Sequence, residues 1–359
     1  MTARTVVLKI HLWLGAGAAI FLVILGLTGS VTAFENDIEH WLHPGLYYVQ
    51  ARPQVLPEAE LIQTVQQRFA PARVVTAHIF RQPDLAHVMQ LNDRSTVLVS
   101  PYDGHILGRI TGPSTTQKIV GYIHQLHTHL VPDPRSAPKA AKIGAVIVQI
   151  VGFILCLLVL LGLILWWRTK RAAIKWQAPW FRISFDAHHA IGIYSALFLF
   201  TAALTGVLVE RGDLIVRLTH SPEPLRFPQL QSSLAAGATP ISVDRAEQIA
   251  LAVIPGTTVT DIQLPLNPKS VFLVILRVPE ETSEAAHSYI FIDQYSGKVL
   301  HAVNFLTESP GYRVIRFNRS IHTGDVWGTP GHILVSLSSL MLVVMVVTGL
   351  VIWLKKLAL

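Results

Sequence analysis

Four long apolar stretches stand out from the mixed pattern of hydrophobic and polar positions along the chain. They run from about Ile10 to Phe34, from Ile143 to Trp167, from Ala190 to Val209 after a helical lead-in from Asp186, and from Ile333 to Leu354. A helix needs about 20 apolar residues to cross a bilayer. The pattern therefore predicts four transmembrane helices. The first stretch is too long for a signal peptide and lacks a small-x-small cleavage site. We therefore expect it to remain in the mature protein as a helix.

The two long segments between these spans show a different periodicity. Each begins with an amphipathic helix pattern, at 56–70 and 242–254, and continues with short stretches that alternate apolar and polar residues. Such alternation predicts strands. The turns PYDGHILG and QYSGKVLHA predict hairpins in which Gly104 and Gly297 take positive φ. Each segment is therefore expected to form a small α+β domain.

The predicted fold is an α-helical integral membrane protein: a four-helix transmembrane bundle with a pseudo-twofold repeat, plus two small periplasmic α+β domains. The boundaries follow from the pattern. We expect helix 1 at 1–35, the first outer domain with a connecting helix at 36–140, helix 2 at 141–168, a cytoplasmic loop at 169–185, helix 3 at 186–211, the second outer domain with a connecting segment at 212–330, and helix 4 with a cytoplasmic tail at 331–359.

Charge gives the orientation. Only 14% of the residues are charged, against about 25% in soluble domains. Lysine and arginine gather before the first span, between the second and third, and after the fourth, which makes that side cytoplasmic. We expect both termini in the cytoplasm of a bacterium and the protein in its inner membrane. The net charge of +7 is explained by these membrane-edge residues, so we expect no nucleic-acid partner.

The chain repeats itself. A shift of 177 positions superposes HLWLG…LTGSV, which begins at His11, on HHAIG…LTGVL, which begins at His188. The second and fourth spans match through LGLILWWRTK and TGLVIWLKK, and LHTH around His127 matches IHTG around His322. Because both copies start inside, we expect a pseudo-twofold axis along the membrane normal. A residue that recurs near this axis can meet its own counterpart.

Two pairs of recurring histidines are the candidate site. His11 with His188 lies toward the cytoplasmic face, and His127 with His322 lies toward the outer face. Two facing imidazoles with no cysteine or carboxylate beside them suit the axial ligation of a b-type haem, so we expect two haems. Nearby small residues allow a flat macrocycle or another helix to approach closely: Gly15, Gly17, Gly29, Gly192 and Gly206.

Neighbouring histidines leave alternatives open. His189 adjoins His188, His124 lies one helical turn before His127, and His332 opens the fourth span. The single cysteine, Cys156, excludes structural disulfides and cysteine-ligated iron–sulfur or c-type haem sites. No nucleotide-binding motif and no catalytic triad is visible, so the catalytic residues stay unknown.

The motifs KIHLWLG, DAHHAIGIY and IHTGDVWGTPG…TGLVIWLKK resemble the PepSY-associated transmembrane family, over nearly the whole chain. The two outer domains look like PepSY domains. The family includes iron-regulated inner-membrane proteins and FoxB-like ferric-siderophore reductases with two b-type haems. The resemblance implies haem ligation by His11, His127, His188 and His322, and reduction of a ferric siderophore or other ferric chelate in the periplasm.

The family pattern leads us to expect a residue that does not ligate haem at position 332, where this chain has His332. The short segment after the fourth span also departs from the pattern, because it carries no fused flavoprotein domain. We therefore expect the electron donor to be a quinol or a separate cytoplasmic reductase. PepSY modules have also been tied to peptidase regulation. The alternative function is thus a membrane-anchored binding or regulatory protein without redox chemistry.

Overall fold

The computed structural model describes residues 2–80, 82–221, 229–233, 238–278 and 287–357. The chain forms two compact units. The bundle unit comprises Met1–Glu35, Lys118–Thr219 and Val314–Leu359, and the sheet unit comprises Asn36–Gln117 and His220–Arg313.

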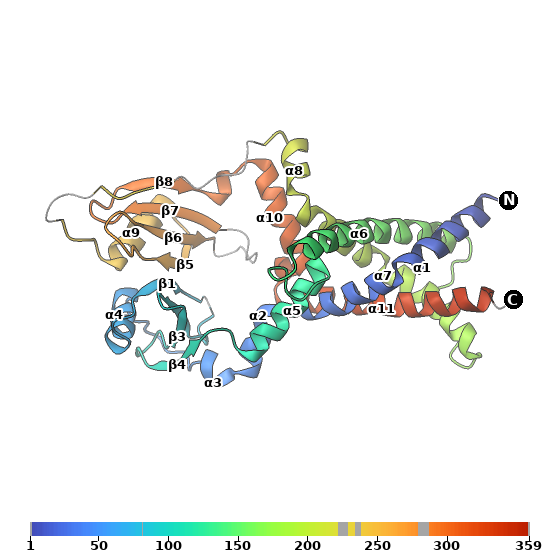
Figure 1. Cartoon of the computed structure of the whole chain (residues 1–359), viewed down its shortest axis with the longest axis horizontal. Coiled ribbons are helices and arrows are strands. Elements are labelled where there is room, and N and C mark those ends of the chain that lie inside the picture. Colours follow the sequence, from blue (N-terminus) through green and yellow to red (C-terminus); the bar gives the residue numbers. More distant parts are fainter. Residues whose placement is uncertain (1, 81, 222–228, 234–237, 279–286, 358–359) are drawn as a thin grey trace. The chain divides into compact units, whose positions relative to one another are not determined.

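Four long apolar helices make up the bundle unit: α1 (Ala3–Thr32), α6 (Pro138–Trp167), α7 (Trp180–Glu210) and α11 (Thr329–Leu357). All four are long and apolar enough to cross a membrane, which confirms the predicted spans, although each helix begins earlier than its apolar stretch. Helices α1 and α7 each pack against both α6 and α11, so α1 and α7 lie diagonally opposite. Both termini lie at one end of this bundle, the terminal end (Figure 1).

The bundle has an apolar core and an apolar exterior. Leu22, Val151, Leu199 and Leu342 pack together in its centre. Other large apolar side chains, such as Phe153 and Leu197, are exposed on its outer surface. Exposed apolar side chains on long helices are stable only in lipid, so the bundle spans a membrane.

Apart from the two helices that cover the sheet, shorter helices occur in both units. The two longest, α5 (Thr115–His129) and α10 (Pro310–Thr323), precede α6 and α11 in the chain. The others are α2 (Glu35–Leu42), α3 (Pro44–Tyr47), α8 (Gly212–Leu218) and the 3₁₀ turns η1 (Phe305–Thr307) and η2 (Asp325–Trp327).

The sheet unit holds one antiparallel sheet in the order β4-β3-β2-β1-β5-β6-β7-β8. Its strands are β1 (Val74–His78), β2 (His87–Leu91), β3 (Ser95–Val99), β4 (Ile106–Thr111), β5 (Thr258–Gln263), β6 (Val271–Arg277), β7 (His287–Asp293) and β8 (Val299–Val303). At its centre β1 pairs with β5, with Ala77 opposite Ile262 and His78 opposite Asp261. This differs from the two separate domains predicted from the sequence, because the first strand of each half pairs with the other.

Helices α4 (Glu58–Arg68) and α9 (Val243–Val253) cover one face of this sheet. Each packs its apolar side on its own half, over cores built around Val65 and Ile290. Ser242 caps α9 by accepting a hydrogen bond from the Arg245 amide. Helix α4 lacks a side-chain cap of its own, and Asp244 from α9 accepts a hydrogen bond from the Ala59 amide at 3.1 Å. The two halves are therefore joined through their helices as well as through β1 and β5.

The predicted hairpin turns are confirmed. Gly104 and Gly297 have φ of +68° and +71°. In each half the tyrosine two residues earlier donates its hydroxyl to a proline carbonyl, from Tyr102 to Pro83 and from Tyr295 to Pro268. These residues have a structural role in both turns.

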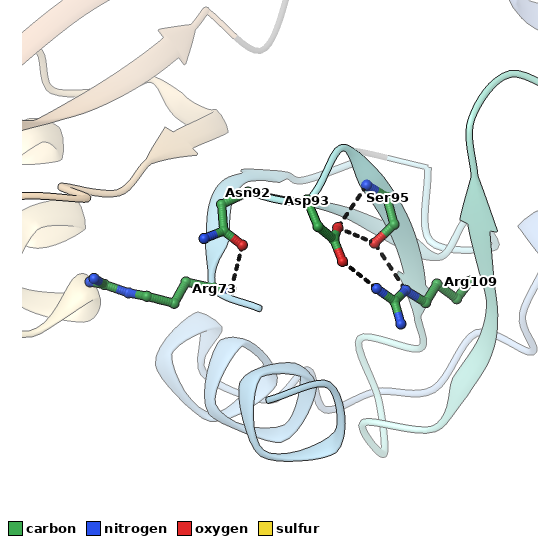
Figure 2. A network of polar contacts seen from close by, with 5 residues as sticks. All are labelled: Arg73, Asn92, Asp93, Ser95 and Arg109. Atoms are coloured by element: carbon green, nitrogen blue, oxygen red, sulfur yellow. Dashed lines mark hydrogen bonds and ion pairs between the residues drawn. The ribbon is translucent and has the colours of Figure 1, made fainter. Parts of the chain in front are cut away.

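A polar network closes the turn between β2 and β3 (Figure 2). Asp93 accepts hydrogen bonds from the amide and the hydroxyl of Ser95, which hold the pKa of its carboxyl below the usual value. Arg109 from β4 pairs with Asp93 and also donates to the Ser95 hydroxyl at 2.9 Å. Asn92 accepts a hydrogen bond from the Arg73 amide. The network holds the edge strand β4 against the hairpin.

A buried contact between a carboxyl and an imidazole supports the first half of the sheet. Glu58 at the start of α4 lies 3.1 Å from Nδ1 of His87, and their side chains are only 8% and 6% exposed. Removing the carboxyl would leave the buried imidazole without this polar neighbour, which costs about 1–3 kcal/mol.

We predict that Glu58→Ala lowers the free energy of local opening of α4 by about 1–3 kcal/mol, because it removes the polar neighbour of the buried His87 imidazole. Hydrogen exchange of the α4 amides, measured on the full chain in detergent, reports this change. The control is Asp103→Asn, which breaks an exposed pair with Arg52 at 3.1 Å and should cost under about 1 kcal/mol. Equal effects of the two variants would contradict the prediction.

Candidate functional site

The bundle unit brings together the histidines that the sequence paired. His11 on α1 and His188 on α7 have ring centroids 6.3 Å apart, at an interplanar angle of 82°. His127 on α5 and His322 on α10 also have ring centroids 6.3 Å apart, at an angle of 37°. We call these the terminal pair and the connector pair.

Each of the four rings lies against two consecutive residues of another helix, and the second of these residues is glycine. We call these dipeptides seats. They are Thr28–Gly29 for His127, Thr205–Gly206 for His322, Thr348–Gly349 for His188 and Leu161–Gly162 for His11. The seats lie on the four transmembrane helices, so every ring is held by a helix other than its own.

The glycine of each seat leaves room for the edge of the ring. A Cβ atom built on the glycine would lie close to Cε1 of the histidine, at 2.8 Å on Gly206, 3.1 Å on Gly29, 3.2 Å on Gly349 and 3.5 Å on Gly162. Three of these distances are shorter than ordinary van der Waals contacts. An added Cβ would force the ring to shift at Gly206, and would crowd it by a few tenths of an ångström at Gly29 and Gly349, whereas Gly162 leaves room for an ordinary contact.

Three seats also provide a hydroxyl for the ring. The distance from threonine Oγ1 to histidine Nδ1 is 3.0 Å at Thr28, 3.1 Å at Thr205 and 3.0 Å at Thr348. Each hydroxyl donates its own proton to the carbonyl four residues earlier, at 2.6, 2.7 and 2.7 Å. The oxygen must therefore accept the Nδ1–H of the ring. This fixes the tautomer and leaves Nε2 unprotonated, with a lone pair available for a metal.

Further contacts hold His322 in place. Its Nδ1 also lies 3.1 Å from the Ala202 carbonyl, and Asn318 of the same helix donates to the Thr205 carbonyl at 3.0 Å. Asn318 is buried. The connector helix α10 is thus fixed to α7 by two side chains.

Burial keeps the connector pair neutral. It lowers the pKa of His127 to about 3, with a further contribution from the neighbouring His322. Burial also lowers the pKa of His322. Neutral imidazole is the form that ligates iron or zinc, so both rings are ready to act as ligands.

A cavity of about 250 Å³ lies at the terminal pair. Both rings of that pair line it, together with Gly15, Gly192, Phe185 and Arg4. Its lining is mainly apolar, and Arg4 contributes a cation. Such a space suits a flat apolar group that carries negative charge at its edge.

The alternative histidines make other contacts. His124 Nδ1 lies 2.5 Å from Glu35, whose hydrogen bond raises the pKa of His124 and favours its charged form. His332 Nε2 lies 3.0 Å from Asp325. His189 donates Nδ1–H to the Phe185 carbonyl and stacks on the Phe185 ring at 4.3 Å. It also lines the cavity beside His188, so of the three it is best placed to replace a member of a pair.

The two pairs fit the axial ligands of a haem. An imidazole nitrogen lies about 2 Å from a metal that it binds, and about 1 Å from its ring centre, so two imidazoles on opposite sides of one ion have centroids about 6 Å apart. Both pairs have 6.3 Å. Within the described ranges, no group of three or more histidine, cysteine or acidic side chains is placed to hold a bare ion. A macrocycle would supply the remaining ligands.

Only part of this site can be predicted from the order of residues. The sequence paired the four histidines and matched the glycines and threonines of the repeat, but it did not assign Thr348, Gly162 or Gly349 to the rings. Of the glycines expected to admit a macrocycle, Gly29 and Gly206 instead admit histidine rings, and Gly17 has no atom within 4 Å of an added Cβ. The signal that was available is the recurrence of Thr-Gly at 28, 205 and 348.

Comparison with known proteins agrees with the resemblance seen in the sequence. The profile of the PepSY-associated TM region matches residues 8–356. A search of curated proteins found no significant match.

We predict that Gly206→Ala destabilises the protein by about 1–3 kcal/mol, the usual cost of overpacking. The reason is the 2.8 Å approach of the new Cβ to His322. Thermal unfolding in detergent measures the change. Gly17→Ala is the control: it lies in α1 with open space around it, and alanine favours a helix over glycine by about 1 kcal/mol. A larger loss for Gly17→Ala than for Gly206→Ala would refute the role of the seat.

Proposed function

The chain belongs to the PepSY-associated transmembrane family, and from this membership we propose that it is a di-haem b electron-transfer protein of the bacterial inner membrane. In this proposal it reduces a ferric siderophore, or another ferric chelate, in the periplasm and so releases iron. The observation that carries the proposal is the 6.3 Å separation of the rings in both histidine pairs.

Each haem would accept and release one electron, and the protein residues hold it and keep water away. His11 and His188 would ligate one iron, and His127 and His322 the other. The seats would orient all four rings. In three seats the threonine hydroxyl accepts Nδ1–H, so Nε2 lies on the side of the ring that faces away from the threonine. Catalytic residues beyond these ligands are not proposed.

The spacing of the pairs suits transfer across the membrane. Along α1, His11 and Thr28, which bonds His127, are 17 residues apart, which is about 26 Å at 1.5 Å per residue. The hydrocarbon core is about 30 Å thick. One pair therefore falls near each face, which supports a relay through the bilayer.

The charge pattern supports the proposed orientation. The terminal end of the bundle carries both termini (Figure 1), and Arg4, Lys9 and the basic loop between α6 and α7 belong to the segments at this end. By the positive-inside rule this end is cytoplasmic, and the sheet unit then lies in the periplasm. The pseudo-twofold relation between the two halves is part of this proposal. It is supported by the matching seats.

The substrate class follows from the chemistry of iron. Siderophores bind Fe(III) through hard oxygen ligands, and adding one electron gives Fe(II), which such ligands hold more weakly. The electron donor would be a quinol in the bilayer or a cytoplasmic reductase that reaches the terminal pair.

We predict that the purified protein, made with an adequate haem supply, shows a Soret band that shifts on reduction by dithionite. Alanine at His11, His188, His127 or His322 should each remove about half of the bound haem. The control is His129→Ala. His129 lies two residues from His127, but its ring contacts the Thr128 hydroxyl and not a seat. His189→Ala tests the remaining alternative ligand. A colourless protein would favour the non-redox binding or regulatory function.

We further predict that ferric siderophores reoxidise the reduced protein when the two are mixed rapidly without oxygen. One Fe(II) should be trapped for each haem reoxidised. His322→Ala should slow this reaction at least tenfold, because it removes a ligand of the proposed outer haem. If no siderophore reacts faster than ferric citrate, the siderophore assignment fails and another acceptor must be sought.

A further inference from the structure

We propose that Leu161 makes the two ligands of the terminal pair unequal, and that this position sets the reduction potential of the iron that they hold. The inference rests on the proposed haem function. It concerns a positioning residue, because Leu161 would act on the iron only through His11.

The argument begins with the three threonine seats. At Thr28, Thr205 and Thr348 the hydroxyl oxygen accepts Nδ1–H from the histidine at 3.0–3.1 Å. In every case the threonine directly precedes the glycine that admits the ring. A threonine at the position before the glycine therefore places its hydroxyl beside Nδ1 of the histidine.

The fourth seat departs from this pattern. Leu161 directly precedes Gly162, and Gly162 faces Cε1 of His11 as the other glycines face their histidines. A leucine side chain has no hydrogen-bond acceptor. Nδ1 of His11 is buried beside the Leu158 carbonyl, as the other three Nδ1 atoms lie beside the carbonyls of Leu25, Ala202 and Met345. His11 therefore differs from the other rings in one respect: no hydroxyl is present to accept its Nδ1–H.

The terminal pair therefore combines two different ligands. His188 has a hydroxyl acceptor for its Nδ1–H, and His11 has none. The connector pair has a hydroxyl for both rings. In the hydroxyl groups that face Nδ1, the two pairs thus differ at one side chain of one seat.

This difference has a direct chemical consequence. A hydrogen bond accepted from Nδ1–H increases the electron density that the imidazole gives to a metal, and this stabilises Fe(III) over Fe(II). Hydrogen bonding around the axial ligands is one of the means by which a protein sets a haem potential. The absence of a hydroxyl at position 161 therefore raises the potential of the terminal centre above the value that a fourth threonine would give.

Redox titration of the full-length protein tests the proposal, with the Soret band as the readout. Leu161→Thr should lower one midpoint potential, and Thr348→Val should raise the same one. We expect a change of about threefold in the reduction equilibrium constant for each, which is about 30 mV at 59 mV per tenfold. The other midpoint should stay unchanged in both variants.

Two controls make the result specific. Leu160→Thr places the same side chain one residue away, at a position that is 45% exposed, and should leave both midpoints unchanged. Thr205→Val should raise only the second midpoint, which belongs to the connector pair.

The outcomes separate this inference from the proposed function. Opposite shifts in Leu161→Thr and Thr348→Val support the inference. If both variants bind two haems and neither midpoint moves, the inference is wrong and the haem function stands. If Leu161→Thr does not load haem, Leu161→Ser places a smaller hydroxyl at the same position, and a lowered midpoint in that variant decides. A wild-type protein without haem overturns both.

Discussion

The close approach of an imidazole ring to the backbone of another helix is the contact on which the bundle depends. At Gly206, Gly29 and Gly349 an alanine would place its Cβ within 2.8–3.2 Å of the ring, so at these three seats glycine permits the approach. The contact fixes α5 against α1, α10 against α7, α1 against α6 and α7 against α11. Because each ring is clamped by one helix while it faces the ring from another, the separation of the rings is determined by helix packing rather than by side-chain rotamers.

Burial and hydrogen bonding work together at these contacts. An apolar interior disfavours a charged imidazole, and a threonine whose proton is already donated within its own helix can only accept. His127 and His322 therefore stay neutral with a defined tautomer. A metal ligand needs both properties, and the helices provide them before any metal binds. The haems proposed for these pairs would then bind with little rearrangement of the protein, which would favour rapid electron transfer as well as affinity.

The spans and the two histidine pairs can be predicted from the sequence, because length, hydropathy and an internal repeat are written directly in the order of residues. The hairpins follow from Tyr-x-Gly for the same reason. The pairing of β1 with β5 cannot be predicted in this way. Both strands alternate apolar and polar residues as the other strands do, and their pairing depends on which sheet edges meet in space. The roles of Gly162 and Thr348 were also hidden, because each serves a histidine on another helix. The repeat nevertheless contained the exception at Leu161, which becomes visible once the Thr-Gly dipeptides are known to hold rings.

The central pairing of β1 with β5 also bears on how this chain can evolve. Each half of the sheet ends at this seam in a strand whose backbone groups are bonded to the other half. A half removed by deletion would leave the remaining one with a bare edge strand, which is prone to pair with other chains. The same deletion would break the hydrogen bond between the Ala59 amide of α4 and the Asp244 side chain of α9, whichever half was removed. The two halves therefore depend on each other structurally, and a variant in which one half is exchanged must also supply a matching edge strand.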